Sequence, residues 1–387
     1  MFSNRMDLFG ESIFTTLAKM RKERMEKGLE VIDLSIGSPN IPPSKHITQV
    51  ISEACLKPEN YLYAINDKDE LLKAVKQWYH RRYSVDSDEK EEIVSLLGSQ
   101  EGLSHLAMTI INDGDSVLVP NPSYPIFKDG ALLAGANIID MPLKKENNYL
   151  IDFSKIKEED AKKAKLMIVS YPNNPTCAIA NEEFYKELIA FAKQYNILVL
   201  HDNAYSELLF EGTGHSFLEY EGAKDIGIEF NSLSKTYGLA GARIGFAVGN
   251  KQMIQLIKTL KSNIDYGMFI PIQLGAIAAI TGDQSCVEET RAAYKHRRDL
   301  LVNGCHNIGW DFDTPQGTMF VWAKIPSTYC SSVEFVNELF EKTGILVVPG
   351  NAFGSEGEGY VRMALVQNDA VIYKALDLMK NSGIFIH

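Results

Sequence analysis

A lysine set among small and hydroxylated residues lies in the stretch NSLSKTYGLAGARIGF (231–246). Ser232 and Ser234, just before Lys235, offer hydroxyl donors. Arg243 offers a planar guanidinium that suits two-point binding of a phosphate. The stretch therefore predicts an anion site that surrounds a lysine side chain.

The wider window 230–264 contains five cationic residues and no aspartate or glutamate, although the whole chain has a formal net charge of −11. Nearby cations without a carboxylate partner favour the uncharged form of a lysine, and only the uncharged amine is a nucleophile. We therefore interpret Lys235 as a nucleophile beside a bound phosphate. The alternative is a solvated surface lysine, which is the commonest environment of this residue type.

The segment GSQEG (98–102) lies where an apolar run changes into a helical pattern. Free backbone N–H groups and the positive end of a helix dipole can make such a turn an anion site, so Gly98, Ser99 and Gln100 are candidate phosphate ligands. An ordinary strand-to-helix turn is the alternative. The chain lacks GxxxxGK[ST], and GLAGARIG (238–245) lacks GxGxxG spacing, so the pattern favours a phosphate without a nucleotide.

A carboxylate and a phenol follow the apolar run ILVL in the segment HDNAY (201–205). Burying these groups costs free energy unless they are paired. Asp202 could bind a protonated ring nitrogen through a charge-assisted hydrogen bond, and Tyr205 could bond a ring oxygen. Equally, Asp202 could cap a helix that starts at Ala204.

Two further loops follow predicted strands. In YPNNPT (171–176), two X-Pro steps predict a rigid loop that presents the amides of Asn173 and Asn174. NPSYP (121–125) places Tyr124 where its ring could stack on a planar ligand. A plain turn explains each loop almost as well.

Elements that would position these residues can be read from about residue 90 to 250, where short β-branched runs alternate with segments of helical period. This alternation predicts an α/β fold with a mostly parallel central sheet and helices on both faces. Ligands of such sheets bind beyond the carboxyl ends of the strands. The predicted strands are IVSLLG, SVLVP, NIIDMPL, KLMIVSYP, ILVLHDNAY, IGIEFNSLS and RIGFAVG.

Two domains are expected, because 387 residues exceed the roughly 250 to 300 at which one hydrophobic core stops growing. We predict a large domain at 46–285 and a smaller α+β domain formed by 1–45 and 286–387. The first 45 residues carry too little core to fold alone, so they should pack across both domains.

The composition excludes several classes of protein. The acidic balance argues against a general affinity for nucleic acid or anionic membranes. Five widely spaced cysteines without a CxxC pair fit neither a disulfide framework nor a zinc site, and no metal site is expected. With no signal-peptide core and no apolar run near the ~20 residues of a membrane span, we expect a cytoplasmic location.

Taken together, these stretches resemble the class I/II aminotransferases, which are fold-type I enzymes dependent on pyridoxal 5′-phosphate. The similarity extends from IDLSIGSPN (32–40) to GYVRMALV (359–366). The segments HDNAYSELLF and SNIDYGMF resemble the branch that contains LL-diaminopimelate, alanine and aspartate aminotransferases.

The resemblance implies roles for the residues around the cofactor ring. Lys235 would form the covalent imine with the cofactor and then move the substrate proton, and Asp202 would keep the pyridine nitrogen protonated. Tyr205 and Asn174 would hold the 3-oxygen of the ring, while Tyr124 would stack on its face. Lys235, Asp202 and Tyr205 are therefore the expected catalytic residues.

The resemblance also assigns the two anion sites. Arg362 would bind the α-carboxylate of the substrate, with Gly37 and Asn174 beside it. Tyr63, or Tyr61 as the alternative, would reach the phosphate of a partner subunit, which implies a homodimer with shared sites. The residues implied to bind the cofactor phosphate are Gly98, Ser99, Gln100, Ser232, Ser234 and Arg243.

Four positions depart from the family's pattern. Cys177 and Asp67 stand where glycine is usual, Ala242 replaces a commonly large residue, and Asn40 replaces a common aspartate. None of these departures removes an implied catalytic group.

The implied reaction is a ping-pong transfer of an amino group between an L-amino acid and a 2-oxo acid, with glutamate and 2-oxoglutarate as one expected pair. Two rivals share the fold: a β-lyase, which would release ammonia, and a catalytically silent cofactor-binding regulator. No DNA-binding extension is present in the sequence, and every expected catalytic group is, which favours the enzyme.

Overall fold

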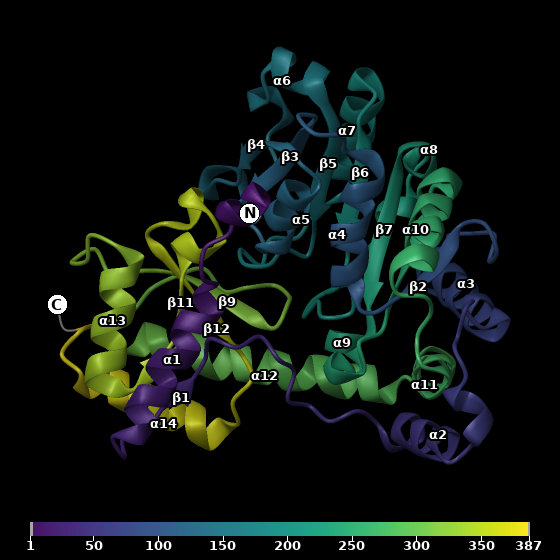
Figure 1. Ribbon diagram of the computed structural model, residues 1–387. Helices are drawn as coiled ribbons and strands as arrows, with labels where there is room; N and C mark the ends of the chain where they lie inside the picture. The colour runs from purple at the N-terminus through teal and green to yellow at the C-terminus, as the bar shows by residue number, and fades with distance from the viewer. Residues whose placement is uncertain (1–2, 386–387) are drawn as a thin grey trace.

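The computed structural model describes residues 3–385, and at its centre is a seven-stranded sheet with the order β2-β8-β7-β6-β5-β3-β4 (Figure 1). Adjacent strands run parallel except at β8, which is antiparallel to both of its neighbours. This confirms the mostly parallel α/β fold. The strands are β2 (Ile93–Leu96), β3 (Ser116–Asn121), β4 (Asn137–Pro142), β5 (Ala164–Ser170), β6 (Leu198–Asp202), β7 (Gly227–Ser232) and β8 (Gly245–Gly249).

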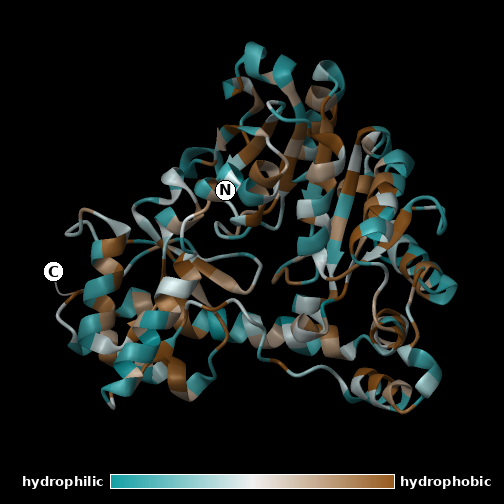
Figure 2. Cartoon of the chain, viewed as in Figure 1, coloured by the Kyte–Doolittle hydropathy of each residue, from teal (hydrophilic) through white to brown (hydrophobic). Residues whose placement is uncertain are grey.

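Side chains of β5 alternate between two cores, as expected for a strand covered on both faces. Leu166 and Ile168 pack in one hydrophobic cluster, and Met167 and Val169 pack in another. The first cluster lies under α4 (Ser99–Ile110), α5 (Ile126–Leu133) and α10 (Lys251–Ile264). The second lies under α3 (Asp69–Tyr83), α7 (Glu182–Tyr195) and α11 (Ile270–Thr281). Figure 2 shows hydrophobic residues concentrated along the central strands and hydrophilic ones on the outer helices.

The crossover helix α7 illustrates how local sequence sets these elements. Asn181 caps its first turn by accepting a hydrogen bond from the N–H of Phe184, and Glu182 and Glu183 complement the positive end of the helix dipole. Asn196 ends the helix in the left-handed conformation, with φ 55°. The amphipathic pattern of EEFYKELIAFAKQYN (182–196) predicts a helix over that whole range, and the structure ends it one residue earlier, at Tyr195.

A smaller α+β unit lies beside the large sheet. Its antiparallel strands have the order β11-β12-β9, and β1 (Ile32–Asp33) pairs in parallel with β10 (Ile345–Leu346). The other elements of this unit are α1 (Ile13–Glu26), α12 (Ser285–Asn307), β9 (Phe320–Lys324), α13 (Ser332–Thr343), β11 (Val348–Pro349), β12 (Tyr360–Ala364) and α14 (Asp369–Asn381).

Two segments connect the units. The long helix α12 runs from the smaller unit toward α11 (Figure 1). The segment after β1 crosses to the large sheet, where the carbonyl of Ile41 lies close to Gly238, and continues into α2 (Lys45–Cys55), which packs on α11. On these grounds we propose the division into a domain at 46–285 and a domain formed by 1–45 and 286–387.

Three short helices complete the chain: α6 (Glu158–Lys163), α8 (Ala223–Ile226) and α9 (Leu233–Thr236). None of the helices within residues 3–385 combines the length and apolar character needed to cross a bilayer.

Candidate active site

A cavity of about 460 Å³ lies beyond the carboxyl ends of the parallel strands, where the two units meet. This is the position at which ligands bind in open α/β sheets. All but one of the residues that the resemblance assigns to the cofactor or substrate line it: Gly37, Gly98, Ser99, Gln100, Tyr124, Asn174, Asp202, Tyr205, Ser232, Ser234, Lys235, Arg243 and Arg362.

The exception is Tyr63, which does not line the cavity and is 86% exposed. Its ring packs loosely against Tyr266, with the ring centroids 6.2 Å apart. The alternative residue, Tyr61, donates its hydroxyl to the carbonyl of Cys55 at 2.9 Å and is also exposed. Neither tyrosine reaches the cavity of its own chain.

Lys235 projects into the cavity from the short helix α9. Ser232 caps this helix by accepting a hydrogen bond from the N–H of Ser234. The amine Nζ donates to the carbonyl of Gly37 at 2.9 Å. Burial lowers the pKa of Lys235 to about 8, and the positive charges of Arg362 and then Arg243 act in the same direction. About a tenth of this amine is therefore uncharged at pH 7, far more than for a lysine in water.

The window 230–264, which lacks aspartate and glutamate, accounts for only part of the positive charge around the Lys235 amine. Of its other cations, Arg243 acts on Lys235, but the three lysines of α10 do not face the cavity. Lys251 pairs with Glu91 at 2.6 Å, for example. The cation with the larger effect on Lys235 is Arg362, which is remote in sequence.

The predicted phosphate turn lies at the N-terminus of α4. Gly98 precedes the helix with φ 77°, a conformation that glycine adopts without strain. A Cβ at this position would lie 2.6 Å from Nη2 of Arg243, so the glycine lets the guanidinium approach the turn. Gln100 accepts a hydrogen bond from the Tyr124 hydroxyl at 3.2 Å. The free N–H groups of the first helical turn and Arg243 thus converge on one end of the cavity.

Asp202 is the last residue of strand β6 and lines the cavity. No helix begins at Ala204, where the chain forms a turn, so helix capping is excluded as the role of Asp202, although its Oδ1 accepts the Ala204 N–H at 3.3 Å. Burial raises the pKa of Asp202 to about 6, opposed by His201, the Ala204 N–H and Lys235. Burial also raises the pKa of the Tyr205 phenol.

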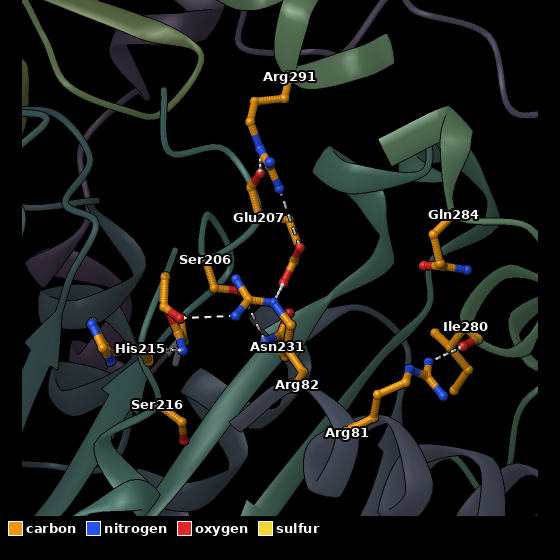
Figure 3. A network of polar contacts seen from close by, with 12 residues as sticks. Arg81, Arg82, Ser206, Glu207, His215, Ser216, Asn231, Ile280, Gln284 and Arg291 are labelled. Atoms are coloured by element: carbon orange, nitrogen blue, oxygen red, sulfur yellow. Dashed lines mark hydrogen bonds and ion pairs between the residues drawn. The ribbon is translucent and has the colours of Figure 1, made fainter. Parts of the chain in front are cut away.

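Glu207, two residues after Tyr205, holds the turn that follows Asp202 through hydrogen bonds to two arginines (Figure 3). The Glu207 carboxylate accepts a hydrogen bond from Nε of Arg82 at 2.6 Å, and its backbone carbonyl accepts one from Nε of Arg291 at 3.0 Å. Arg82 lies on α3 and Arg291 on α12. The turn is therefore tied both to the large sheet's helices and to the helix that bridges the two units.

Arg362 is only 2% exposed, yet its guanidinium has no carboxylate partner among residues 3–385. Nη1 donates to Oδ1 of Asn174 at 2.9 Å and Nη2 to the carbonyl of Ser35 at 3.0 Å, whereas Nε is buried without an acceptor. The ring of Phe320 lies 4.1 Å from the guanidinium carbon. Burial lowers the pKa of Arg362 to about 10.

The loop over 171–176 differs in part from the prediction. Asn174 lines the cavity, but Asn173 turns inward, donating to the carbonyl of Ser170 and accepting from Thr176. The next residue, Cys177, has φ 62°, which explains why glycine suits this position. Burial raises the pKa of the Cys177 thiol to about 12, so it is not a nucleophile near neutral pH.

Sequence reasoning missed an apolar part of the cavity lining. Phe14 comes from α1, Ile36 from the crossing segment and Phe320 from β9. These three residues are far apart in sequence and lie in ordinary apolar patterns. Only the packing of the smaller unit over the sheet brings them together, so the sequence carried no signal for them.

The charge of the cavity defines the ligand that it suits. Its described lining contains three cationic side chains, Lys235, Arg243 and Arg362, but one carboxylate, Asp202. The buried Arg362 cation is costly without a partner, and the exposed Arg243 guanidinium is free to bind a second anion, so two anionic groups are expected from the ligand. One would lie at the turn near Arg243 and the other at Arg362. A phosphate at the first place and a carboxylate at the second satisfy this arrangement.

Comparisons with known proteins identify the family. A family model described as aminotransferase class I and II matches residues 30–377. The chain is 45% identical over 374 residues to an LL-diaminopimelate aminotransferase of Halothermothrix orenii, which covers 96% of each chain. A second relative of the same name, from Aquifex aeolicus, is 41% identical over 98% of each chain.

The chain belongs to the class I and II aminotransferase family. Solved structures agree: apo-BacF from Bacillus subtilis has 36% identity and a TM-score of 0.97 over 100% of both chains. A probable N-succinyldiaminopimelate aminotransferase from Thermus thermophilus has 30% identity and a TM-score of 0.91, covering 96% of this chain and 100% of that one. The protein is an aminotransferase that moves an amino group between an amino acid and a 2-oxo acid, and its family depends on pyridoxal phosphate.

Proposed function

We propose that this aminotransferase binds pyridoxal 5′-phosphate in the Lys235 cavity and carries out two successive half-reactions there, in a ping-pong sequence. When bound, the cofactor supplies a ring that withdraws electrons and so stabilises the negative charge left on the substrate's α-carbon. The residues fit such a group because the cavity lining has more cations than carboxylates. The surplus is divided between Arg243, beside Leu97, and Arg362, beside Asn174.

Each polar residue of the cavity has a separate task in this proposal. Asp202 would keep the ring nitrogen protonated, Tyr205 and Asn174 would hold the ring's 3-oxygen, and Tyr124 would cover the ring face. The phosphate would be bound by Gly98, Ser99, Gln100, Ser232, Ser234 and Arg243.

Lys235 would hold the cofactor covalently and, once released by an incoming amino acid, carry the proton from the substrate's α-carbon. Its pKa of about 8 is close enough to neutral pH for the amine both to accept and to release a proton. Arg362 would grip the substrate's α-carboxylate in two-point fashion and thereby fix the direction of the Cα–H bond, with Gly37 beside it. The network around Glu207 would keep Asp202 and Tyr205 in place.

The observation that carries the proposal is the buried Arg362 guanidinium without a carboxylate partner in the described chain. The protein bears the cost of desolvating this charge, and a substrate carboxylate would offset it. A binding protein that recognised only the cofactor would have no use for this group.

For the substrates, we propose glutamate and 2-oxoglutarate as one pair and LL-diaminopimelate as the other amino compound, in line with the names of the relatives. A second candidate is an amino acid with an apolar side chain. It is favoured by Phe14, Ile36 and Phe320, which give the cavity an apolar wall beside Arg362.

We also propose that the enzyme works in the cytoplasm as a homodimer. Support for the dimer is an exposed apolar surface around the end of α2, formed by Leu56, Leu62, Tyr63 and Ile65. An apolar cluster of this kind is typical of an interface between subunits. A second copy packed there would bring Tyr63 toward a neighbouring cavity.

The function is tested by adding single amino acids to the purified holoenzyme without an oxo acid and recording the cofactor's absorbance. LL-Diaminopimelate and glutamate should each convert the cofactor to its amino form, with release of one oxo acid per site and no ammonia. Conversion by phenylalanine but not by these two would favour the apolar donor. Ammonia release without a stable amino form would indicate a lyase, and no response to any amino acid would contradict the proposal.

The variant Lys235→Ala provides the control. It should bind pyridoxal phosphate without a covalent bond, so that borohydride no longer fixes the cofactor to the chain. Cofactor fixed to another lysine in the wild-type protein would refute the assignment of Lys235.

A further inference from the structure

A buried carboxylate lies behind the turn formed by Gly98, Ser99 and Gln100. Glu101 follows this turn directly, in the first turn of α4, and its side chain is 6% exposed. Its Oε2 accepts a hydrogen bond from the backbone N–H of Leu97 at 2.5 Å. Leu97 precedes the turn and Glu101 follows it, so this one hydrogen bond closes the turn across its base.

The other oxygen of Glu101 is held from a separate helix. The ammonium group of Lys261, on α10, contacts Oε1 of Glu101, and the Lys261 side chain is 7% exposed. Asp265 and His105 complete the cluster, with Oδ1 of Asp265 3.7 Å from the lysine amine and Nδ1 of His105 3.8 Å from Oε1 of Glu101. Lys261 balances the charge of one of these two carboxylates, and burial, followed by the hydrogen bond with Asp265, raises the pKa of Glu101 to about 7.

Arg243 holds the same backbone from the opposite side. Its Nη2 donates to the carbonyl of Leu97 at 3.5 Å and lies against Gly98. Leu97, the residue that precedes the turn, is thus held through both of its flanking peptide groups, at its N–H by Glu101 and at its C=O by Arg243. Since Arg243 also lines the cavity, the backbone conformation at Leu97 is coupled to the anion site.

We propose that Glu101 is a positioning residue for the phosphate group, an inference that rests on the proposed function. Braced by Lys261, it holds the turn of Gly98, Ser99 and Gln100 in the conformation that aims its free N–H groups into the cavity. Donors fixed before the ligand arrives need not be ordered on binding, and this strengthens binding. A Glu101 that only joined α4 to α10 would stabilise the fold without favouring phosphate over other ligands.

The test compares two ligands that differ only by the phosphate. Apoenzyme carrying Glu101→Gln is titrated with pyridoxal 5′-phosphate and with pyridoxal, and dissociation constants are measured by absorbance. Glutamine has one acceptor oxygen and one NH2 donor where the carboxylate has two acceptor oxygens, so it cannot accept from both the Leu97 N–H and the Lys261 ammonium group. Losing one of these hydrogen bonds should weaken binding of pyridoxal phosphate about tenfold or more and binding of pyridoxal less than about twofold. Equal weakening of both ligands, or no weakening of either, would overturn the proposal.

The control is Glu91→Gln, because the half-exposed Glu91 pairs at 2.6 Å with Lys251, which lies at the start of α10, ten residues before Lys261. It should leave both dissociation constants unchanged.

The variant Lys261→Met should weaken binding of pyridoxal phosphate selectively, as Glu101→Gln does. The effect should be smaller, because the hydrogen bond from the Leu97 N–H to Glu101 remains. If wild-type apoenzyme fails to bind pyridoxal phosphate at all, the proposed function fails. If wild type binds it and both variants bind it equally well, only this inference fails.

A measurement on the wild-type apoenzyme covers the case in which neither variant folds. Hydrogen exchange followed by mass spectrometry, with overlapping peptides that resolve Leu97, reports whether the turn is formed before the cofactor binds. We expect the Leu97 amide to be protected without any ligand and unchanged when inorganic phosphate is added. Rapid exchange that slows only with phosphate or cofactor would show that Glu101 does not set the turn in advance.

Discussion

At the scale of single residues, the chemistry depends on how Lys235 is surrounded. Burial is the largest cause of its lowered pKa, and Arg362 and Arg243 add to the effect while Asp202 opposes it. The protein thus favours the uncharged amine by desolvation and like charge together. In the proposed function the two arginines would also bind the anionic groups of cofactor and substrate, so one set of charges would serve two purposes.

This arrangement predicts a pH dependence for cofactor attachment to the apoenzyme. Only the uncharged amine reacts, so the rate should rise about tenfold per pH unit up to the pKa of about 8 and then level off. In Arg362→Gln a neighbouring positive charge is lost, which raises the pKa of Lys235 and should move the bend in the profile to higher pH. The measurement is the initial rate of imine absorbance, and a bend that stays in place would show that Arg362 does not act on Lys235.

At the scale of elements, the phosphate end of the cavity depends on the junction between β2 and α4. The junction requires a left-handed residue at position 98 and a close approach of Arg243 to its backbone. Both requirements are met by glycine alone. Position 98 is therefore constrained by backbone conformation and by space at once.

The substitution Gly98→Ala separates these two constraints when it is compared with Gly212→Ala. Gly212 also has a left-handed backbone, with φ 69°, but a Cβ there would meet no atom within 4 Å. Gly212→Ala should lower the free energy of unfolding by about 1 kcal/mol, from backbone strain alone, and leave binding of pyridoxal phosphate unchanged. Gly98→Ala should lower the free energy of unfolding by more than this. It should also weaken binding of pyridoxal phosphate about tenfold or more, because Arg243 is displaced. Equal cofactor affinity in the two variants would contradict this reading.

At the scale of the whole molecule, one predicted residue gains a role only if two chains associate. Tyr63 is exposed beside the apolar side chains of Leu56 and Ile65, and it lies outside the cavity of its own chain. In a closed two-fold dimer, each chain's Tyr63 would serve the other chain's site.

Mixing experiments test this sharing. Tyr63→Phe dimers should bind pyridoxal phosphate more weakly, and Lys235→Ala dimers should be inactive. When equal amounts are dissociated and reassociated, half of the dimers are mixed, and each mixed dimer holds one site with both native residues. Activity at limiting cofactor should therefore recover to roughly a quarter of the wild-type value. Recovery no greater than the sum of the separate proteins would argue that Tyr63 acts within its own chain or not at all.

Much of the site could be predicted because its residues follow strands. Asp202 and Ser232 lie at the carboxyl ends of β6 and β7, and Gly98 follows β2. Alternating apolar patterns located these strands, and in a parallel sheet such ends meet at one edge. The sheet, the crossover helix α7 and the phosphate turn were therefore accessible from local sequence.

What the sequence alone determined was the identity of the chemical groups and their order along the chain, since these depend on local patterns of apolar, glycine and polar residues. Tertiary structure alone decided which charges act on one another. The lowered pKa of Lys235 depends more on Arg362 than on its neighbour Arg243, and the apolar wall combines Phe14 with Phe320. Electrostatic effects and burial depend on distance in space, and residues separated by most of the chain come together only when both units pack.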